Sequence, residues 1–151
     1  MSLITFIIPS INRPTIDNTI QSLLNQTNPK WECFILYDGV EGKNFDDPRI
    51  KIFNLNKLGK KGERHGNAGL VRNEGIKMCK TEWIGFLDDD DTIHEDYVKT
   101  LFEKYTSYDF VVWRKNYQGS RVIISIFAIS QRTIHYIDLL AILRSILFQA
   151  V

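Results

Sequence analysis

The sequence predicts an α/β fold in which helices cover both faces of a mostly parallel central sheet. Short apolar runs rich in β-branched residues alternate with longer segments whose apolar residues recur at helical spacing. Strands that alternate with helices in this way favour parallel pairing through crossover helices. Polar residues also follow directly on several of the apolar runs, as expected where parallel strands end at a ligand-binding edge.

The composition agrees with a soluble globular domain. The chain has 151 residues, of which 44% are hydrophobic and 25% are charged, enough for one domain with its own core. A net charge of +1 gives no bulk attraction for polyanions, so we expect no nucleic-acid partner. No stretch approaches the ~20 apolar residues of a membrane span, and the N-terminus lacks the basic region of a signal peptide. We therefore expect a cytoplasmic protein, with a place at the periphery of a membrane as the alternative.

Cys33 and Cys79 are the two cysteines of the sequence. Each lies in an apolar or helical stretch and neither belongs to a C-x-x-C motif. We expect two reduced packing residues and no disulfide.

The first expected strand spans residues 3–9 and is apolar and β-branched. A turn follows, and Pro14 suits the first turn of a helix that ends near Gln26. The apolar residues of this helix fall on one face, so one side of it should be buried.

Two further strands are expected at residues 31–37 and 49–55, the second after a polar loop. The Gly- and Lys-rich residues 56–66 predict a loop, and residues 68–79 a helix.

A fourth strand is expected at residues 83–87 and a helix at about 93–105. Residues 110–114 and 122–130 predict two more strands. Residues 134–148 predict a helix that is apolar nearly all round, so it should pack on the sheet or against another subunit.

Four consecutive aspartates, Asp88 to Asp91, follow the apolar residues 83–87. Neighbouring carboxylates repel one another, and a hard divalent cation such as Mg²⁺ relieves that repulsion. The alternative is a helix start, because Thr92 and Glu95 fit a capping box. A helix start does not need four acids, so the metal or phosphate site is the preferred hypothesis.

The segment from Gly66 to Gly75 is the second informative block. Its glycines permit close backbone approach, and Arg72 offers a planar fork for a phosphate or a base at a helix N-terminus. The alternative is a solvated helix face with glycine packing. The lysines of the preceding loop are more simply explained as solvated charge.

Polar residues also follow the first two strands. Ser10, Asn12 and Arg13 come after the first, and Asp38 comes after the second. Each has a local alternative, such as a cap, a surface charge or an Asp-Gly turn. Because the carboxyl ends of parallel strands meet at one edge, we expect these residues and the acidic run to converge.

Four blocks of the sequence resemble family 2 glycosyltransferases of the GT-A fold. They occur in the order typical of that family, within residues 3–105. They are Thr5-Phe6-Ile7-Ile8-Pro9-Ser10, Tyr37-Asp38-Gly39, Asn67-x-Gly69-x-x-Arg72-Asn73-x-Gly75 and Leu87-Asp88-Asp89-Asp90-Asp91.

The resemblance implies a nucleotide-diphosphate sugar donor, with a UDP-sugar favoured over a GDP-sugar. It implies that the acidic run is the D-x-D motif, in which Asp88, Asp90 and Asp91 hold Mn²⁺ or Mg²⁺. It places Asp89 at the variable position and implies a donor-nucleotide site. The residues of that site would be Pro9, Ser10, Asn12, Arg13, Asp38, Arg72 and Asp90.

The chain departs from the family pattern in two places. Tyr37 fills a position that is commonly acidic, and Val40 follows Gly39 in place of a serine. The catalytic base has no matching motif, although Asp109 and Asp138 are acids of the later part.

The expected organisation is a single GT-A-like domain over residues 1–151. Residues 1–108 would be the nucleotide-sugar-binding half. Residues 109–151 would be a reduced acceptor region or an oligomerisation part, which makes the chain a short or truncated member and a homo-oligomer an expected state.

The preferred hypothesis is a metal-dependent, inverting glycosyltransferase that moves a sugar to an acceptor hydroxyl of a carbohydrate, lipid or protein. The alternative is a non-catalytic nucleotide-sugar or metal-binding module that lacks its acceptor half.

Overall fold

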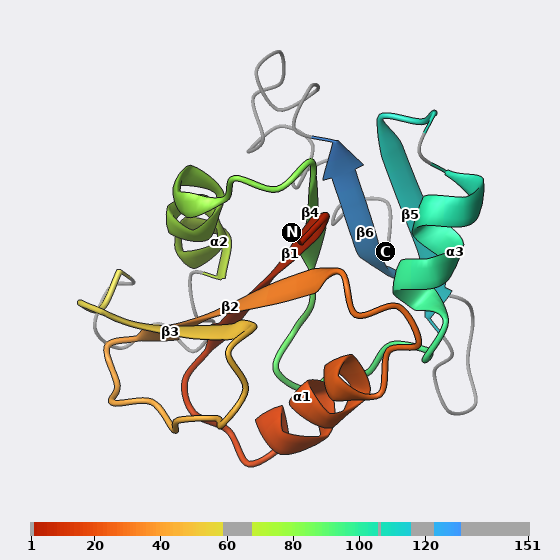
Figure 1. The fold of residues 1–151 in the computed structure, drawn as a ribbon. Helices are drawn as coiled ribbons and strands as arrows, with labels where there is room; N and C mark the ends of the chain where they lie inside the picture. Colours follow the sequence, from red (N-terminus) through yellow and green to blue (C-terminus); the bar gives the residue numbers. More distant parts are fainter. Residues whose placement is uncertain (1, 59–67, 106, 116–122, 131–151) are drawn as a thin grey trace.

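The computed structural model describes residues 2–58, 68–105, 107–115 and 123–130 (Figure 1). Within these ranges it has six strands and three helices. They are β1 (Ile4–Ser10), α1 (Ile16–Leu24), β2 (Trp31–Asp38), β3 (Ile50–Leu55), α2 (Ala68–Met78), β4 (Trp83–Phe86), α3 (Tyr97–Lys104), β5 (Phe110–Lys115) and β6 (Ile123–Ser130). All six predicted strands and the first three predicted helices are present.

The strands form one sheet in the order β3-β2-β1-β4-β6-β5. β1 pairs in parallel with both β2 and β4, and β2 pairs in parallel with β3. β6 runs antiparallel to β4 and β5. The prediction of a mostly parallel α/β sheet is therefore confirmed, with β6 as the reversed strand.

Alternation along β1 divides the core into two layers, one on each face of the sheet. Ile4, Phe6 and Ile8 belong to the layer that contains the buried residues of α1 and α3. Ile7 belongs to the opposite layer, together with Val71 of α2. Helices thus cover both faces, as the alternating pattern predicts (Figure 1).

The prediction that the third helix begins near Ile93 with a capping box is wrong. α3 begins at Tyr97, after an N-cap residue that makes no side-chain capping hydrogen bond. The preceding segment bonds to the end of α1 instead. The Ile93 N–H donates to Ser22 Oγ at 3.2 Å, and Gln26 Nε2 donates to the His94 carbonyl at 2.8 Å.

The first helix begins two residues later than Pro14, at Ile16. Pro14 lies in the preceding turn, where its carbonyl accepts a hydrogen bond from the Asp17 N–H at 3.4 Å. The helix predicted for residues 134–148 lies outside the described residues.

Cys33 and Cys79 are both buried and free. They belong to the core layers on opposite faces of the sheet, so the sheet itself lies between them. Burial raises the pKa of the Cys79 thiol to about 12 and that of Cys33 further. The prediction of two packing cysteines is confirmed.

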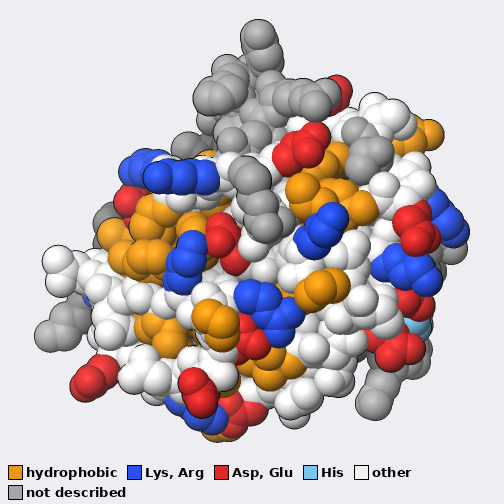
Figure 2. All heavy atoms as spheres, viewed as in Figure 1, with side chains coloured by type: hydrophobic (Ala, Val, Ile, Leu, Met, Phe, Trp, Pro, Cys, Tyr) orange, Lys and Arg blue, Asp and Glu red, His pale blue; other side chains and the backbone are white. Residues whose placement is uncertain are grey.

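The surface agrees with the balanced charge of the sequence. On the face seen in Figure 2, acidic and basic side chains are interspersed among apolar and neutral ones. Among the described residues, no helix is long and apolar enough to cross a membrane.

Candidate donor-binding site

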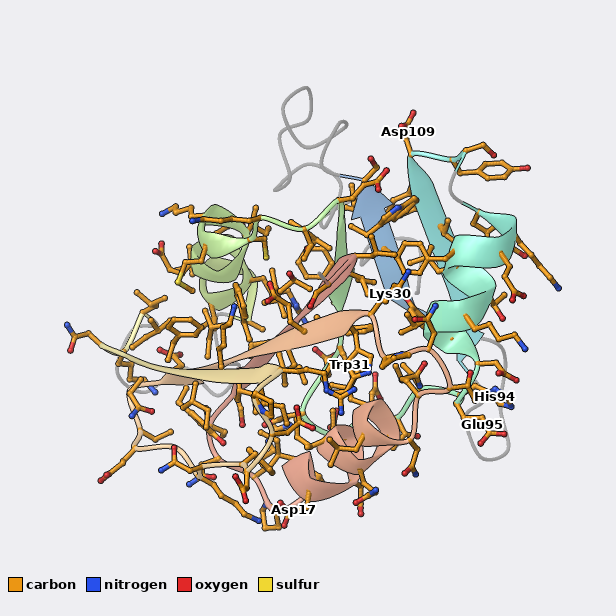
Figure 3. All side chains as sticks on the ribbon, viewed as in Figure 1. Asp17, Lys30, Trp31, His94, Glu95 and Asp109 are labelled. Carbon is orange, nitrogen blue, oxygen red and sulfur yellow. The ribbon has the colours of Figure 1, made fainter. Side chains whose placement is uncertain are left out.

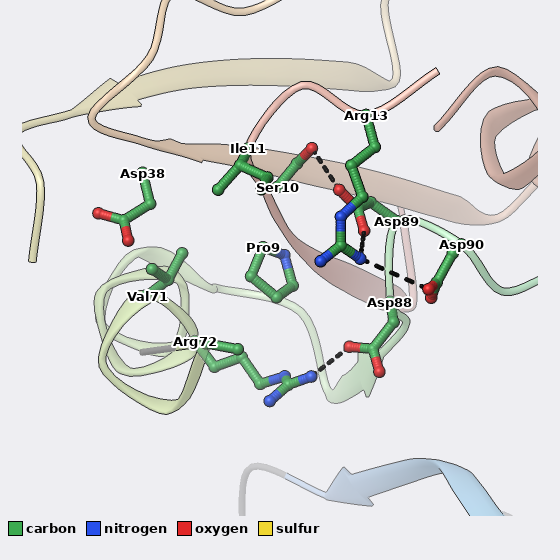
Figure 4. Close-up of a pocket in the computed structure, with 11 residues that line it drawn as sticks. Pro9, Ser10, Ile11, Arg13, Asp38, Val71, Arg72, Asp88, Asp89 and Asp90 are labelled. Carbon is green, nitrogen blue, oxygen red and sulfur yellow. Dashed lines mark hydrogen bonds and ion pairs between the residues drawn. The ribbon is translucent and has the colours of Figure 1, made fainter. Parts of the chain in front are cut away.

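A pocket of about 370 Å³ lies at the carboxyl ends of β1, β2 and β4 (Figure 4). Residues from the turn after β1, the end of β2, the start of α2 and the acidic run line it. They are Pro9, Ser10, Ile11, Arg13, Asp38, Ala68, Val71, Arg72, Asp88, Asp89 and Asp90. This is the edge at which open α/β sheets bind ligands.

The acidic run forms a turn directly after β4. The Asp91 N–H donates to the Asp88 carbonyl at 3.1 Å. This hydrogen bond closes a turn over the four aspartates. Carboxylate oxygens of Asp88, Asp90 and Asp91 lie within 4.8 Å of one another. Two oxygens that bind one cation at about 2.0–2.6 Å lie no more than about 5 Å apart, so these three carboxylates fit a single hard divalent cation.

Asp89 points away from that group and bonds to the end of β1. Ser10 Oγ donates to Asp89 Oδ2 at 2.7 Å, and Arg13 Nη1 approaches Asp89 Oδ1 at 3.4 Å (Figure 4). The Asp89 side chain is only 6% exposed. Asp89 therefore joins the turn after β1 to the acidic turn after β4.

The turn after β1 is shaped by Asn12. Its φ angle is +64°, a left-handed conformation that asparagine tolerates better than most residues. Its backbone N–H donates to Ser10 Oγ at 2.9 Å, and its side chain donates to the Glu41 carbonyl at 3.1 Å. Asn12 thus supports the turn, and its side chain does not line the pocket.

Arg72 enters the pocket from the first turns of α2 and pairs with Asp88. Gly75 holds this helix close to the sheet, because a Cβ at that position would lie 2.7 Å from Ile7 Cγ2. The Nε atom of Arg72 is buried and has no hydrogen-bond partner among the described residues. The glycine-packing interpretation is therefore correct for Gly75, and Arg72 still faces the ligand edge.

Asp38 lies on the far side of the pocket from the acidic turn (Figure 4). It is the last residue of β2, and its Oδ1 accepts a hydrogen bond from the Leu58 N–H at 2.7 Å. The next residue, Gly39, has a φ of +71°, which turns the chain out of the sheet. Asp38 is thereby fixed at the end of β2, where it lines the pocket.

Tyr37 does not act as the acid that the family pattern has at this position. It is fully buried, and its hydroxyl donates to the Lys43 carbonyl at 3.3 Å. Burial is the main cause that raises the pKa of Tyr37 above its ordinary value, so the side chain stays neutral at physiological pH. Its side chain packs in the core layer that contains the buried residues of α1 and α3.

The described lining of the pocket is acidic. It carries four aspartates and two arginines. Each arginine pairs with at least one aspartate, Arg72 with Asp88, and Arg13 with Asp89 and Asp90. A diphosphate entering this part of the pocket would meet uncompensated carboxylates, unless a cation neutralised them.

The structure brings together six of the seven residues that the resemblance assigns to nucleotide binding, all except Asn12. Asp89, Ile11, Ala68 and Val71 also line the pocket, although the sequence predicted no contact for them. Ile11, Val71 and Asp89 each lie beside a predicted site residue, and Ala68 lies one helical turn before Arg72. Asp138 lies outside the described residues.

Asp109 is not among the residues that line this pocket, and Figure 3 shows it at the start of β5. Its carbonyl accepts a hydrogen bond from the Ser130 N–H at 2.9 Å, and Ser130 pairs with Trp83 at the start of β4. The acidic turn follows the other end of β4. Asp109 therefore sits at the opposite edge of the sheet.

The family model described as Glycosyl transferase family 2 matches residues 5–136. TarP of Staphylococcus aureus, a poly(ribitol-phosphate) beta-N-acetylglucosaminyltransferase, is 30% identical over 125 residues, which cover 79% of this chain and 38% of TarP. TuaG of Bacillus subtilis, described as a teichuronic acid biosynthesis glycosyltransferase, is 29% identical over 110 residues, which cover 67% of this chain and 41% of TuaG.

A crystal structure of TarS from S. aureus in complex with UDP-GlcNAc has a similar fold. Its TM-score is 0.61 at 20% identity, over 81% of this chain and 37% of that one. The chain thus spans about two fifths of the length of these relatives. The family model covers most of the sequence, and the chain belongs to the family 2 glycosyltransferases.

Proposed function

We propose that this chain binds a nucleotide-diphosphate sugar in the pocket after β1, β2 and β4 and serves the transfer of its sugar to an acceptor hydroxyl. The observation that carries the proposal is the acidic turn, where three carboxylates lie within 4.8 Å of one another beside two arginines. A divalent cation would offset the net negative charge of this lining, which a diphosphate would otherwise meet.

In this proposal Asp88, Asp90 and Asp91 hold Mn²⁺ or Mg²⁺. The cation, when bound, supplies charge neutralisation for the diphosphate that leaves as the sugar is transferred. Arg72 contributes a further positive charge at the same end of the pocket. Asp38, on the other side, accepts hydrogen bonds from the nucleoside.

Transfer with inversion needs a base that takes the proton of the acceptor hydroxyl as the hydroxyl attacks the anomeric carbon from the face opposite the diphosphate. No residue of the described site is proposed for that task. Residues 109–151 are proposed as a reduced acceptor region, and the base has no assigned residue. The acceptor classes remain a carbohydrate, a lipid or a protein hydroxyl.

A UDP-sugar is the preferred donor class. The choice is supported by TarP, which is named as an N-acetylglucosaminyltransferase, and by the TarS structure that contains UDP-GlcNAc. UDP and UDP-GlcNAc are therefore the first ligands to test, with GDP as the comparison.

The test is calorimetric binding of UDP and GDP with and without Mn²⁺, on the parent protein and on Asp90→Asn. Asp90 is half exposed, so its replacement leaves the core intact. Asp46→Asn is the matched control, because Asp46 is an exposed acid outside the pocket. We expect Mn²⁺ to strengthen UDP binding at least tenfold in the parent and in Asp46→Asn, and by much less in Asp90→Asn. Equal Mn²⁺ dependence in all three proteins would contradict the proposal.

An assay of UDP release on the parent protein distinguishes an enzyme from a non-catalytic module. Release of UDP from UDP-GlcNAc, with water or an added acceptor, would indicate an active enzyme. Metal-dependent binding of the donor without any release would favour the module that lacks its acceptor half.

A further inference from the structure

Two of the three carboxylates proposed to hold the cation are engaged by arginines in this structure. Arg72 pairs with Asp88, and Arg13 Nη1 lies 3.5 Å from Asp90 Oδ2 (Figure 4). A guanidinium group that occupies a carboxylate competes with a cation for the same oxygens. It also places a like charge beside the cation position.

Arg13 differs from Arg72 in how it is held. Arg72 is largely buried, whereas 52% of the Arg13 side chain and 51% of the Asp90 side chain are exposed. Exposed ion pairs of this kind contribute little stability. Little stability is therefore lost when Arg13 leaves Asp90 for a stronger partner.

Asp89 is a second partner of Arg13. Arg13 Nη1 also lies 3.4 Å from Asp89 Oδ1, and Asp89 is buried and bonded to Ser10 at 2.7 Å. The resemblance leaves Asp89 at a variable position without a role. Here it is a fixed acceptor that tethers the arginine at the mouth of the pocket.

A diphosphate offers Arg13 a stronger partner than Asp90 does. Guanidinium groups bind phosphate oxygens through two parallel charge-assisted hydrogen bonds. Movement of Arg13 to the diphosphate would free Asp90 for the cation. Donor and cation would then each favour the binding of the other, by the reciprocity of linked equilibria.

We propose that Arg13 is a positioning residue that blocks Asp90 in the free protein and exchanges it for the donor diphosphate, with Asp89 as its tether. This inference rests on the proposed function, because it concerns the same donor and cation. It adds that Arg13 opposes the binding of the cation alone and favours the binding of the nucleotide.

The test compares Arg13→Gln with the parent in two separate binding measurements. Titration with Mn²⁺ alone, followed by the electron paramagnetic resonance of free Mn²⁺, gives the cation affinity. Titration with UDP in the presence of EDTA gives the nucleotide affinity. Loss of the competing charge should tighten Mn²⁺ binding roughly threefold to tenfold, whereas loss of the phosphate partner should weaken UDP binding by a similar factor.

Two variants control for charge and for folding. Lys43→Gln removes one positive charge from an exposed pair with Asp17, outside the pocket, and should leave both affinities unchanged. Arg13→Lys keeps the charge but loses the planar fork, so its Mn²⁺ affinity should stay within about twofold of the parent while UDP binding weakens. A general loss of structure would not move the two affinities in opposite directions.

The outcomes separate this inference from the proposed function. A parent protein that binds neither Mn²⁺ nor UDP overturns both. If the parent binds both ligands but Arg13→Gln binds Mn²⁺ no more tightly than Lys43→Gln does, the proposed role of Arg13 is overturned and the proposed function stands.

Discussion

Tyr37 occupies a position that is commonly acidic in the family, but here the residue is part of the core. It is fully buried and its hydroxyl reaches the Lys43 carbonyl rather than the pocket. We expect Tyr37→Phe to lower the free energy of unfolding by about 1 kcal/mol, through the lost hydrogen bond, and to leave UDP affinity unchanged. Urea unfolding and calorimetry measure the two effects. A fall in UDP affinity beyond fivefold with normal stability would mean that the hydroxyl contacts the nucleotide.

The acidic turn shows what could be predicted at the scale of residues. The sequence places four carboxylates after a buried strand, and this pattern favours the hypothesis of a cation site over a helix start. The resemblance selects Asp88, Asp90 and Asp91, and the oxygens of these same residues lie close together. The bond from Ser10 to Asp89 was not predictable, because it depends on how two turns from distant parts of the chain face each other.

At the scale of elements, the strands were predicted more closely than the helix starts. A buried strand ends close to the end of its apolar run: β4 ends at Phe86, one residue before Leu87, the last apolar residue ahead of the acids. The start of α3 is instead decided by tertiary bonds. Ser22 and Gln26 of the neighbouring helical segment hold residues 93 and 94 out of helical geometry. The capping pattern at Thr92 and Glu95 therefore does not set the helix start, because it depends on tertiary hydrogen bonds that cannot be read from the local sequence.

α2 offers a prediction from two of its own glycines. A Cβ at Gly75 would lie 2.7 Å from Ile7 Cγ2, whereas a Cβ at Gly69 would have no heavy atom within 4 Å among the described residues. We expect Gly75→Ala to destabilise the fold by about 1–3 kcal/mol through overpacking. Gly69→Ala should be neutral, or stabilising by up to about 1 kcal/mol, because alanine favours a helix. Chemical unfolding of both variants checks this, and equal effects would show that α2 does not rest on β1 through Gly75.

At the scale of the whole molecule, topology explains why the site could be anticipated. Ser10, Asp38 and Asp88 are far apart in the sequence, but each follows or ends a strand of one parallel set. Parallel pairing brings these strand ends to a single edge. The later part of the chain carries no comparable signal, because β6 reverses the strand direction and its neighbouring residues match no motif quoted for the site.

The edge on which an acid lies also decides whether it can serve the reaction. Asp109 precedes β5 beside the start of β4, whereas the pocket lies beyond the end of β4. We therefore expect Asp109→Asn to leave UDP binding unchanged, and to keep any release of UDP from UDP-GlcNAc within twofold of the parent rate. Asp90→Asn, measured beside it, should lose the Mn²⁺-dependent part of both. A loss of turnover in Asp109→Asn with normal UDP binding would contradict this expectation and would give Asp109 a part in the transfer step.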